Sequence, residues 1–206
     1  MFYNDLAGRD IGRLAALSDG IFAFAFTLLV LDIHVPDVRG VHSEADLWVA
    51  LGPLVPHIIT AGLTFLTLGI FWVGQQTVLS YVRVANRSMA WIQIAFLFAV
   101  VAMPFSTALL SEFITYRVAL LVYWFNIVAL GSLNYVSWSY GIHAGLFSDD
   151  AEPARRASER RIFVGQSLYA LGAALCAINT YVSITFIVLV QLNYAIAPKF
   201  RWLYRL

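Results

Sequence analysis

The residues that could do chemistry in this chain begin with polar side chains inside its first long apolar segment. The segment RLAALSDGIFAFAFTLLVLDI covers residues 13–33, with Arg13, Ser18 and Asp19 near its start and Asp32 near its end. Charged side chains at membrane depth are costly, and they usually mark an ion pathway or pair with other polar groups. Two interpretations follow: these side chains line a water-filled path, or they form a polar network that holds the segment in place.

Motifs for other chemistry are absent from the sequence. It contains no GxxxxGK[ST], HExxH or GxSxG motif, and no TVGYG-like filter of the common potassium channels. The histidines form no pair at ligand spacing, and a single cysteine excludes an intramolecular disulfide. These residues are His34, His42, His57, His143 and Cys176. We therefore expect a protein that is not an enzyme, with no cofactor and no tightly bound metal.

The composition indicates a membrane protein. The 206 residues are 61% hydrophobic and 12% charged, with a mean hydropathy of +0.77 and a formal net charge of +1. Soluble domains carry about 25% charged residues, so most of this surface must face something other than water. The small net charge argues against nucleic-acid binding, which needs a concentrated basic face.

The apolar segments predict an all-α fold in one domain, residues 1–206, with six transmembrane helices. A helix needs about 20 mostly apolar residues to cross a bilayer. The predicted spans cover residues 14–35, 47–77, 89–110, 118–142, 162–181 and 183–197. Pro53 and Pro56 predict an irregular start to the second span.

The loops predict the orientation of the chain. Eleven basic residues fall on the side that holds both termini, and only two, Arg39 and Arg117, fall on the other. Short loops rich in Lys and Arg stay in the cytoplasm. We therefore expect a multi-pass protein of the inner (plasma) membrane with both termini cytoplasmic. The eleven residues are Arg9, Arg13, Arg83, Arg87, Arg155, Arg156, Arg160, Arg161, Lys199, Arg201 and Arg205.

The loop SDDAEPARRASERR predicts a solvated, salt-bridged start to the fifth helix. Its charges are mixed, and acidic and basic residues recur at helical spacing. Contact between its four arginines and lipid headgroups is a further interpretation.

A helical wheel divides the first span into two sides. At about 100° per residue, one continuous apolar face forms with Thr27 at its margin, while Asp19 lies on the opposite side. The residues of this face are Gly20, Phe24, Leu28, Leu31 and Val35. The wheel alone leaves open whether this face lines a pore or packs against lipid and protein.

Three segments resemble one known family. They are similar, in order and spacing, to segments of the transmembrane protein 175 family. The three are the first-helix pattern of an arginine followed by Ser-Asp-Gly, TLGIFWVGQQ at 67–76 and AWIQIAFLFAVVAMPFSTALLSEF at 90–113. The resemblance covers about the first 115 residues. This chain departs from the family pattern at Leu17, where an aromatic residue is usual, and at Gln75 and Gln76, where a histidine pair is common.

The resemblance implies a potassium-permeable cation channel. In this family four first helices surround a central pore and apolar side chains form its constriction, so one six-helix unit per chain implies a homotetramer in the lipid bilayer. Matched positions place the constriction at Phe24, Leu28 and Leu31, and ion selectivity at Thr27. Phe24 stands where isoleucine or leucine is usual. Potassium and other monovalent cations are then the permeant ions.

The polar residues of the first span take a supporting role in this interpretation. Arg13 and Asp19 are six residues apart and cannot pair on one helix face, so each needs partners from other helices. We expect a buried network that joins Ser18 and Asp19 to residues at the same depth. The expected partners are Trp72, Gln75, Gln76 and Asn86. Asp32 is either an outer-mouth residue that concentrates cations or a helix cap.

Three other functions remain open on the sequence alone: a secondary transporter, a proton-permeable channel and a non-conducting membrane scaffold. Transporters often show inverted repeats and paired helix breaks, and this sequence shows neither.

Overall fold

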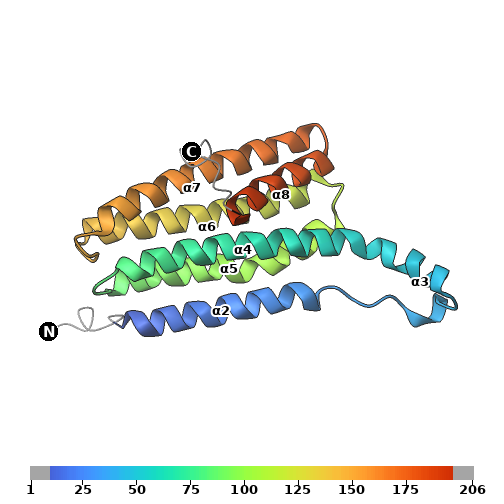
Figure 1. Ribbon diagram of the computed structural model, residues 1–206, viewed down its shortest axis with the longest axis horizontal. Helices are drawn as coiled ribbons and strands as arrows, with labels where there is room; N and C mark the ends of the chain where they lie inside the picture. The colour runs from blue at the N-terminus through green and yellow to red at the C-terminus, as the bar shows by residue number, and fades with distance from the viewer. Residues whose placement is uncertain (1–9, 197–206) are drawn as a thin grey trace.

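The computed structural model describes residues 10–196, and it is a bundle of long helices that run side by side (Figure 1). Helix α2 lies along one edge of the bundle and α7 along the opposite edge, with α4, α5 and α6 between them. The helices are α2 (Ile11–Leu31), α3 (Glu44–Leu51), α4 (Val55–Tyr81), α5 (Arg87–Glu112), α6 (Arg117–His143), α7 (Ala151–Ala174) and α8 (Thr180–Ile196).

Short polar side chains begin three of these helices. Asp10 Oδ1 accepts a hydrogen bond from the Arg13 backbone N–H at 3.1 Å, and Asn86 Oδ1 accepts one from the Met89 N–H at 2.9 Å. Ser43 Oγ caps α3 in the same way. Each cap satisfies a backbone donor that has no partner inside its helix. Helices α2 and α5 therefore begin directly after the polar residues that cap them.

The predicted irregular start of the second span is present. Helix α3 ends at Leu51, a single 3₁₀ turn covers Gly52–Leu54, and α4 begins at Val55. Pro53 and Pro56 lack the backbone N–H that would continue the helix through this point. The segment between α2 and α4 thus bends at its prolines, and α3 projects from the end of the bundle (Figure 1).

Four of the six predicted spans are long and apolar enough to cross a membrane. They are Ile11–Leu31, Glu44–Tyr81, Arg87–Glu112 and Arg117–His143. Helix α7 is too polar in its first half, and α8 has only 17 residues. The chain is therefore a multi-pass membrane protein, and a count of six spans stays a prediction. The last residue of the predicted sixth span, 197, lies outside the described residues.

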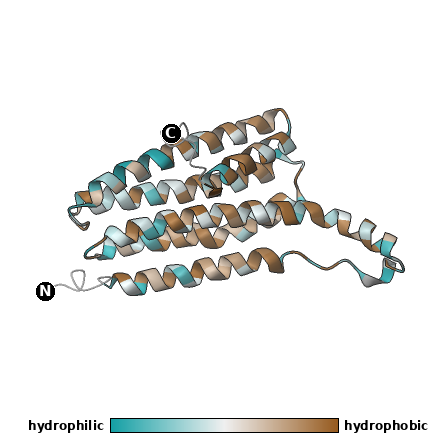
Figure 2. Ribbon diagram, viewed as in Figure 1, coloured by the Kyte–Doolittle hydropathy of each residue, from teal (hydrophilic) through white to brown (hydrophobic). Residues whose placement is uncertain are grey.

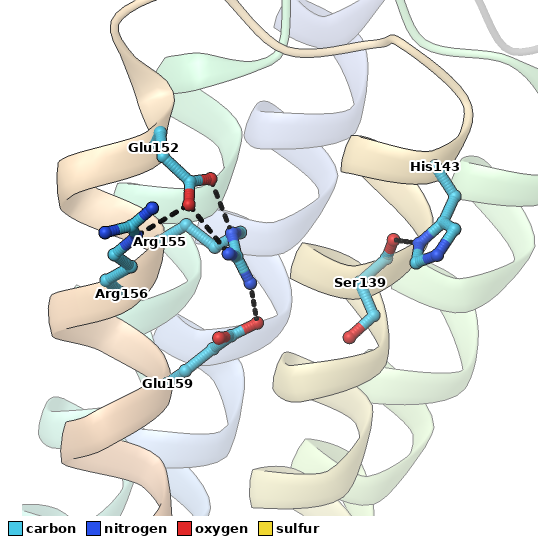
Figure 3. Close-up of polar contacts among 6 residues, drawn as sticks. All are labelled: Ser139, His143, Glu152, Arg155, Arg156 and Glu159. Carbon is cyan, nitrogen blue, oxygen red and sulfur yellow. Dashed lines mark hydrogen bonds and ion pairs between the residues drawn. The ribbon is translucent and has the colours of Figure 1, made fainter.

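The first half of α7 is polar and internally paired (Figures 2 and 3). Arg155 donates hydrogen bonds to Glu152 and Glu159 at 2.7–2.8 Å, and Arg156 reaches Glu152 at 2.7 Å. The guanidinium groups of Arg155 and Arg156 lower the pKa of the Glu152 carboxyl to about 2. The prediction of a salt-bridged helix start is confirmed.

The loops between α4 and α5 and between α6 and α7 meet at one end of the bundle. Val82 pairs with Phe147 in an isolated antiparallel bridge, and Arg83 reaches Asp149 at 3.0 Å. Seven of the eleven basic residues assigned to one side lie toward this end, which we call the basic end. They are Arg13, Arg83, Arg87, Arg155, Arg156, Arg160 and Arg161. The other four, Arg9, Lys199, Arg201 and Arg205, lie outside the described residues.

The core combines aromatic packing with buried hydroxyl groups. The Phe22 ring, 1% exposed, packs against the rings of Phe26 and Phe96 at 6.3 and 6.2 Å between centroids. Deeper in the bundle, the Tyr123 hydroxyl lies 3.0 Å from Thr67 Oγ1, which in turn accepts from Gln191 Nε2. Packing thus holds α2 to α5, and hydrogen bonds hold α8 to α4 and α6.

Replacement of Phe22 by alanine should destabilise the bundle by about 3–5 kcal/mol, because it leaves a cavity between α2 and α5. Thermal unfolding in detergent measures the change. Phe163→Ala is a matched control, since that ring is 58% exposed on α7. Equal melting temperatures for the two variants would contradict the assignment of Phe22 to the core.

Candidate ion pathway

Helix α2 has one face locked against the bundle and one face left open. Its buried residues recur at intervals of three and four, so they form one stripe toward α4 and α5. They are Leu14, Ser18, Phe22, Ala25 and Leu29. On the other side Phe24 is 60% exposed and Leu31 is 71% exposed. A single chain therefore leaves the Phe24 side of α2 without a protein partner among the described residues.

Two hydrogen-bonded contacts join the start of α2 to the end of α4. The Ser18 hydroxyl, fully buried, donates to Gln75 Oε1. Asp19 Oδ1 accepts from Trp72 Nε1 at 2.9 Å and from Gln76 Nε2 at 2.7 Å. The structure thus brings together five residues that the sequence analysis assigned to one network. Asp19 differs from the expectation in being exposed, because it lies at the edge of the α2–α4 contact.

The hydrogen bonds continue from Gln75 across two more helices. Gln75 Nε2 donates to Gln93 Oε1 at 2.9 Å, and Gln93 Nε2 donates to Ser137 Oγ at 3.0 Å. Ser137 Oγ then donates to the Leu133 carbonyl at 2.9 Å. The result is one buried chain from α2 through α4 and α5 to α6. Gln93 and Ser137 were not predicted as members of this network, although the glutamine inside the apolar run AWIQIAF indicates a buried polar contact at Gln93.

Two expected members of this network lie elsewhere. Asn86 caps α5 and donates from Nδ2 to the Tyr140 hydroxyl at 2.9 Å, so it joins α5 to α6 instead of reaching Asp19. Arg13 is exposed on the first turn of α2, where its backbone N–H bonds Asp10. Within residues 10–196 its guanidinium has no hydrogen bond to Ser18 or Asp19. The reason is spacing: Arg13 lies more than a turn closer to the basic end.

The four residues assigned to the pore differ in their surroundings. Phe24 and Leu31 are exposed, whereas Leu28 is half-buried toward α4 and α5. Thr27 is exposed, and its hydroxyl donates to the Phe24 carbonyl at 2.8 Å. Helix α2 ends at Leu31, so Val35, which the wheel placed on the same face, is not on the helix. The open face is therefore one turn shorter than the wheel predicted.

Asp32 caps the end of α2 beside an open hollow of about 780 Å³, open space at its mouth included. The Asp32 backbone N–H donates to the Leu28 carbonyl at 3.2 Å, and its own carbonyl lies 2.9 Å from His34 Nδ1. Leu28 and His57 also line this hollow. Asp32 is thus a helix cap, and its exposed carboxylate stands at the end of the bundle opposite the basic end.

The fold and this site define a class: a multi-pass helical membrane protein whose first helix is fixed on one side and bare on the other. Residues 13–104 match the family model described as endosomal/lysosomal potassium channel TMEM175. The chain is 35% identical over 178 residues to a potassium channel of Streptomyces collinus, covering 83% of this chain and 84% of that protein. It is 30% identical over 182 residues to a potassium channel of Chamaesiphon minutus, covering 85% and 88%.

The fold agrees with a solved relative. The crystal structure of a lysosomal potassium-selective channel TMEM175 homolog from Chamaesiphon minutus matches with a TM-score of 0.79 and 27% identity, over 92% of this chain and 98% of that one. The chain belongs to the TMEM175 family, and the family is one of ion channels, not of enzymes.

Replacement of Asp19 by alanine should weaken the α2–α4 contact, because Trp72 Nε1 and Gln76 Nε2 both lose their acceptor. The expected loss is about 1–3 kcal/mol in the free energy of unfolding. Asp19→Asn keeps an acceptor oxygen and should lose less. Thermal unfolding and size-exclusion chromatography compare the two variants. An Asp19→Ala protein of native stability with altered ion selectivity would instead place Asp19 in the ion path.

Proposed function

We propose that the protein is a potassium-permeable channel of the plasma membrane, assembled as a homotetramer in which four α2 helices surround a central pore. The observation that carries this proposal is the bare Phe24 side of α2, opposite a side locked by buried hydrogen bonds. Family membership supports potassium as the permeant ion, because two relatives that match most of the chain are named potassium channels. The basic end is cytoplasmic in this proposal, with both termini.

A ring of four Phe24 side chains would form the constriction, with Leu31 and Leu28 toward the outer end. Phenyl and isobutyl groups offer no ligand to a cation, so a narrow apolar ring blocks current by excluding water. Opening must widen the ring until a hydrated or partly hydrated ion passes. Because Leu28 is half-buried, it lines the pore less directly than Phe24 and Leu31.

Thr27 supplies the oxygen atoms that an apolar ring lacks. Its hydroxyl donates to the Phe24 carbonyl, and a hydroxyl that donates one hydrogen bond keeps its lone pairs for another partner. The local bond therefore orients the oxygen without consuming its capacity to bind a cation. The exposed carboxylate of Asp32 raises the cation concentration at the outer entrance. No resident cofactor is part of this mechanism.

Replacement of Phe24 by alanine should raise the basal potassium flux, because it removes the bulkiest side chain of the constriction. Flux from potassium-loaded liposomes measures the effect on the purified oligomer. Phe163→Ala is the matched control, since Phe163 is exposed to a similar degree, 58% against 60%, on the opposite edge of the bundle. Equal flux from the two variants would assign Phe24 to packing between subunits.

Thr27→Val should lower the preference for potassium over sodium, because valine keeps the shape of threonine and removes its oxygen. Thr27→Ser keeps the hydroxyl and should keep the preference. Reversal potentials in bilayers under potassium and sodium gradients measure both variants. Unchanged reversal potentials for Thr27→Val would remove Thr27 from the selectivity mechanism. No current from the unaltered protein under any ionic condition would overturn the channel proposal itself.

A further inference from the structure

A second polar site lies away from α2, between α4, α6, α7 and α8. It is a pocket of about 610 Å³, a volume that includes open space at its mouth. Glycines make room for two of the side chains that line it: a Cβ at Gly131 would overlap the Gln166 side chain, and a Cβ at Gly74 would come within 2.9 Å of Asn134 Nδ2. The pocket is therefore built into the packing of four helices.

Two carboxamide oxygens in this pocket lack hydrogen-bond partners. Gln166 Nε2 donates to the Ile127 carbonyl at 3.0 Å, which fixes the amide, and the buried Gln166 Oε1 has no partner. Asn134 is 5% exposed, and its Oδ1 also has none. A buried acceptor without a donor destabilises the folded protein. Both oxygens belong to residues that line the pocket, and both are covered from water by neighbouring atoms. A donor group in the pocket would satisfy them after a small rotation of the two amide side chains.

The charge in the pocket restricts what that molecule can be. Arg161 lines it, with its guanidinium 5.2 Å from the centre of the Tyr194 ring, and none of the described lining residues is acidic. A bare cation at the amide oxygens would meet this positive charge with no compensating carboxylate. A ligand that carries both a donor-bearing cation and an anionic group satisfies the amides and the arginine together, and adds no net charge.

The position of the pocket along the membrane normal points to a lipid. The first half of α7 is hydrophilic and its second half is mainly hydrophobic (Figure 2). In the sequence the change falls between Arg161 and Ile162, which both line the pocket. This change of polarity is where lipid headgroups meet acyl chains. Apolar side chains of α4, among them Ile70 and Val73, also line the pocket, and Val73 is 49% exposed.

We propose that this pocket binds the headgroup of a phospholipid with a primary ammonium, as in phosphatidylethanolamine. The ammonium donates to Gln166 Oε1 and Asn134 Oδ1 and lies near the ring of Tyr169, and the phosphate accepts from Arg161. The Ser158 hydroxyl is a second donor to the phosphate at the mouth of the pocket. The acyl chains leave along α4 and α7.

The proposed function bears on this site in one respect. If four α2 helices form the pore, α7 on the opposite edge of each bundle faces the lipid (Figure 1). The pocket itself is present within one chain and does not depend on the pore. A protein that conducts potassium and ignores the lipid would overturn the lipid site alone, and a lipid response without current would overturn the channel alone.

The test compares phosphatidylethanolamine with phosphatidylcholine of the same acyl chains. The two headgroups share phosphate and positive charge, but the quaternary ammonium of choline has no N–H donor. Added to the delipidated oligomer in an uncharged detergent, phosphatidylethanolamine should raise the melting temperature and phosphatidylcholine should raise it much less. An equal response to both lipids overturns the proposal, as does a response to soluble phosphoethanolamine without one to the lipid.

Variants assign the response to the pocket. Arg161→Gln should weaken the apparent affinity for phosphatidylethanolamine by roughly tenfold or more, because it removes a charge-assisted hydrogen bond. Arg156→Gln is the charge-matched control on the same helix, since Arg156 pairs with Glu152 and does not line the pocket. A lipid response that survives Arg161→Gln, or that Arg156→Gln reduces equally, overturns the site.

Asn134→Leu should change the lipid response without lowering the stability of the lipid-free protein. It replaces an unpartnered buried amide by an apolar side chain of similar size, so the lipid-free protein should melt no lower than the unaltered one. The same variant should lose most of the response to phosphatidylethanolamine. A full lipid response in Asn134→Leu would show that the lipid binds without the Asn134 amide, and would overturn the proposal.

Discussion

The buried chain of hydrogen bonds from Ser18 through Gln75 and Gln93 to Ser137 is the constraint on which the rest of the bundle depends. In the hydrocarbon region of a bilayer there is no water to satisfy an amide, so a buried amide gains most from a partner within the protein. Each of the two glutamines uses its oxygen toward one helix and its nitrogen toward the next. Four helices are thereby held at one depth and in one rotation. An apolar contact alone would permit them to slide or rotate, because lipid tails solvate leucine as well as another helix does.

This constraint explains the division of roles on α2. Ser18 lies roughly 120° around the helix from Phe24, so a hydrogen bond that turns Ser18 inward turns Phe24 outward. The Asp19 contacts with Trp72 and Gln76 close the edge of the same interface and oppose rotation about the helix axis. The polar residues of α2 can therefore influence ion passage without contacting an ion. In the proposed channel they keep the apolar face of α2 at a fixed angle. A hydrophobic constriction would need such rigidity, because a small displacement of its side chains changes whether water can enter.

The sequence predicted this arrangement where local spacing determines it. The wheel separated Phe24 from Asp19, and depth matching along two antiparallel helices placed Trp72, Gln75 and Gln76 near Ser18 and Asp19. It was less successful where the outcome depends on a third helix or on a helix end. Gln93 and Ser137 contribute through a register between α5 and α6 that no local pattern contains. Asn86 was predicted as a network member, but it is the N-cap of α5. Val35 does not belong to the helix, because α2 ends at Leu31 and Asp32 is its C-cap. The polar half of α7 was predicted correctly, since its charges recur at helical spacing.

Two pairs of buried amide side chains differ in how they are hydrogen-bonded. Gln191, outside both pairs, also has an unpartnered oxygen and does not line the pocket. Gln75 and Gln93 are buried and have both amide ends paired inside the protein. Gln166 Nε2 is hydrogen-bonded, whereas Gln166 Oε1 has no hydrogen-bond partner. Asn134, which lines the same pocket, also has an oxygen without a partner. Leucine at both positions would leave no unpartnered oxygen, and the glycines at 74 and 131 make room for the Asn134 and Gln166 side chains. The Gln75–Gln93 pair and the pair in the pocket are thus two kinds of polar site. The first kind fixes helices to each other, and the second is complete only when a donor from outside the chain occupies it.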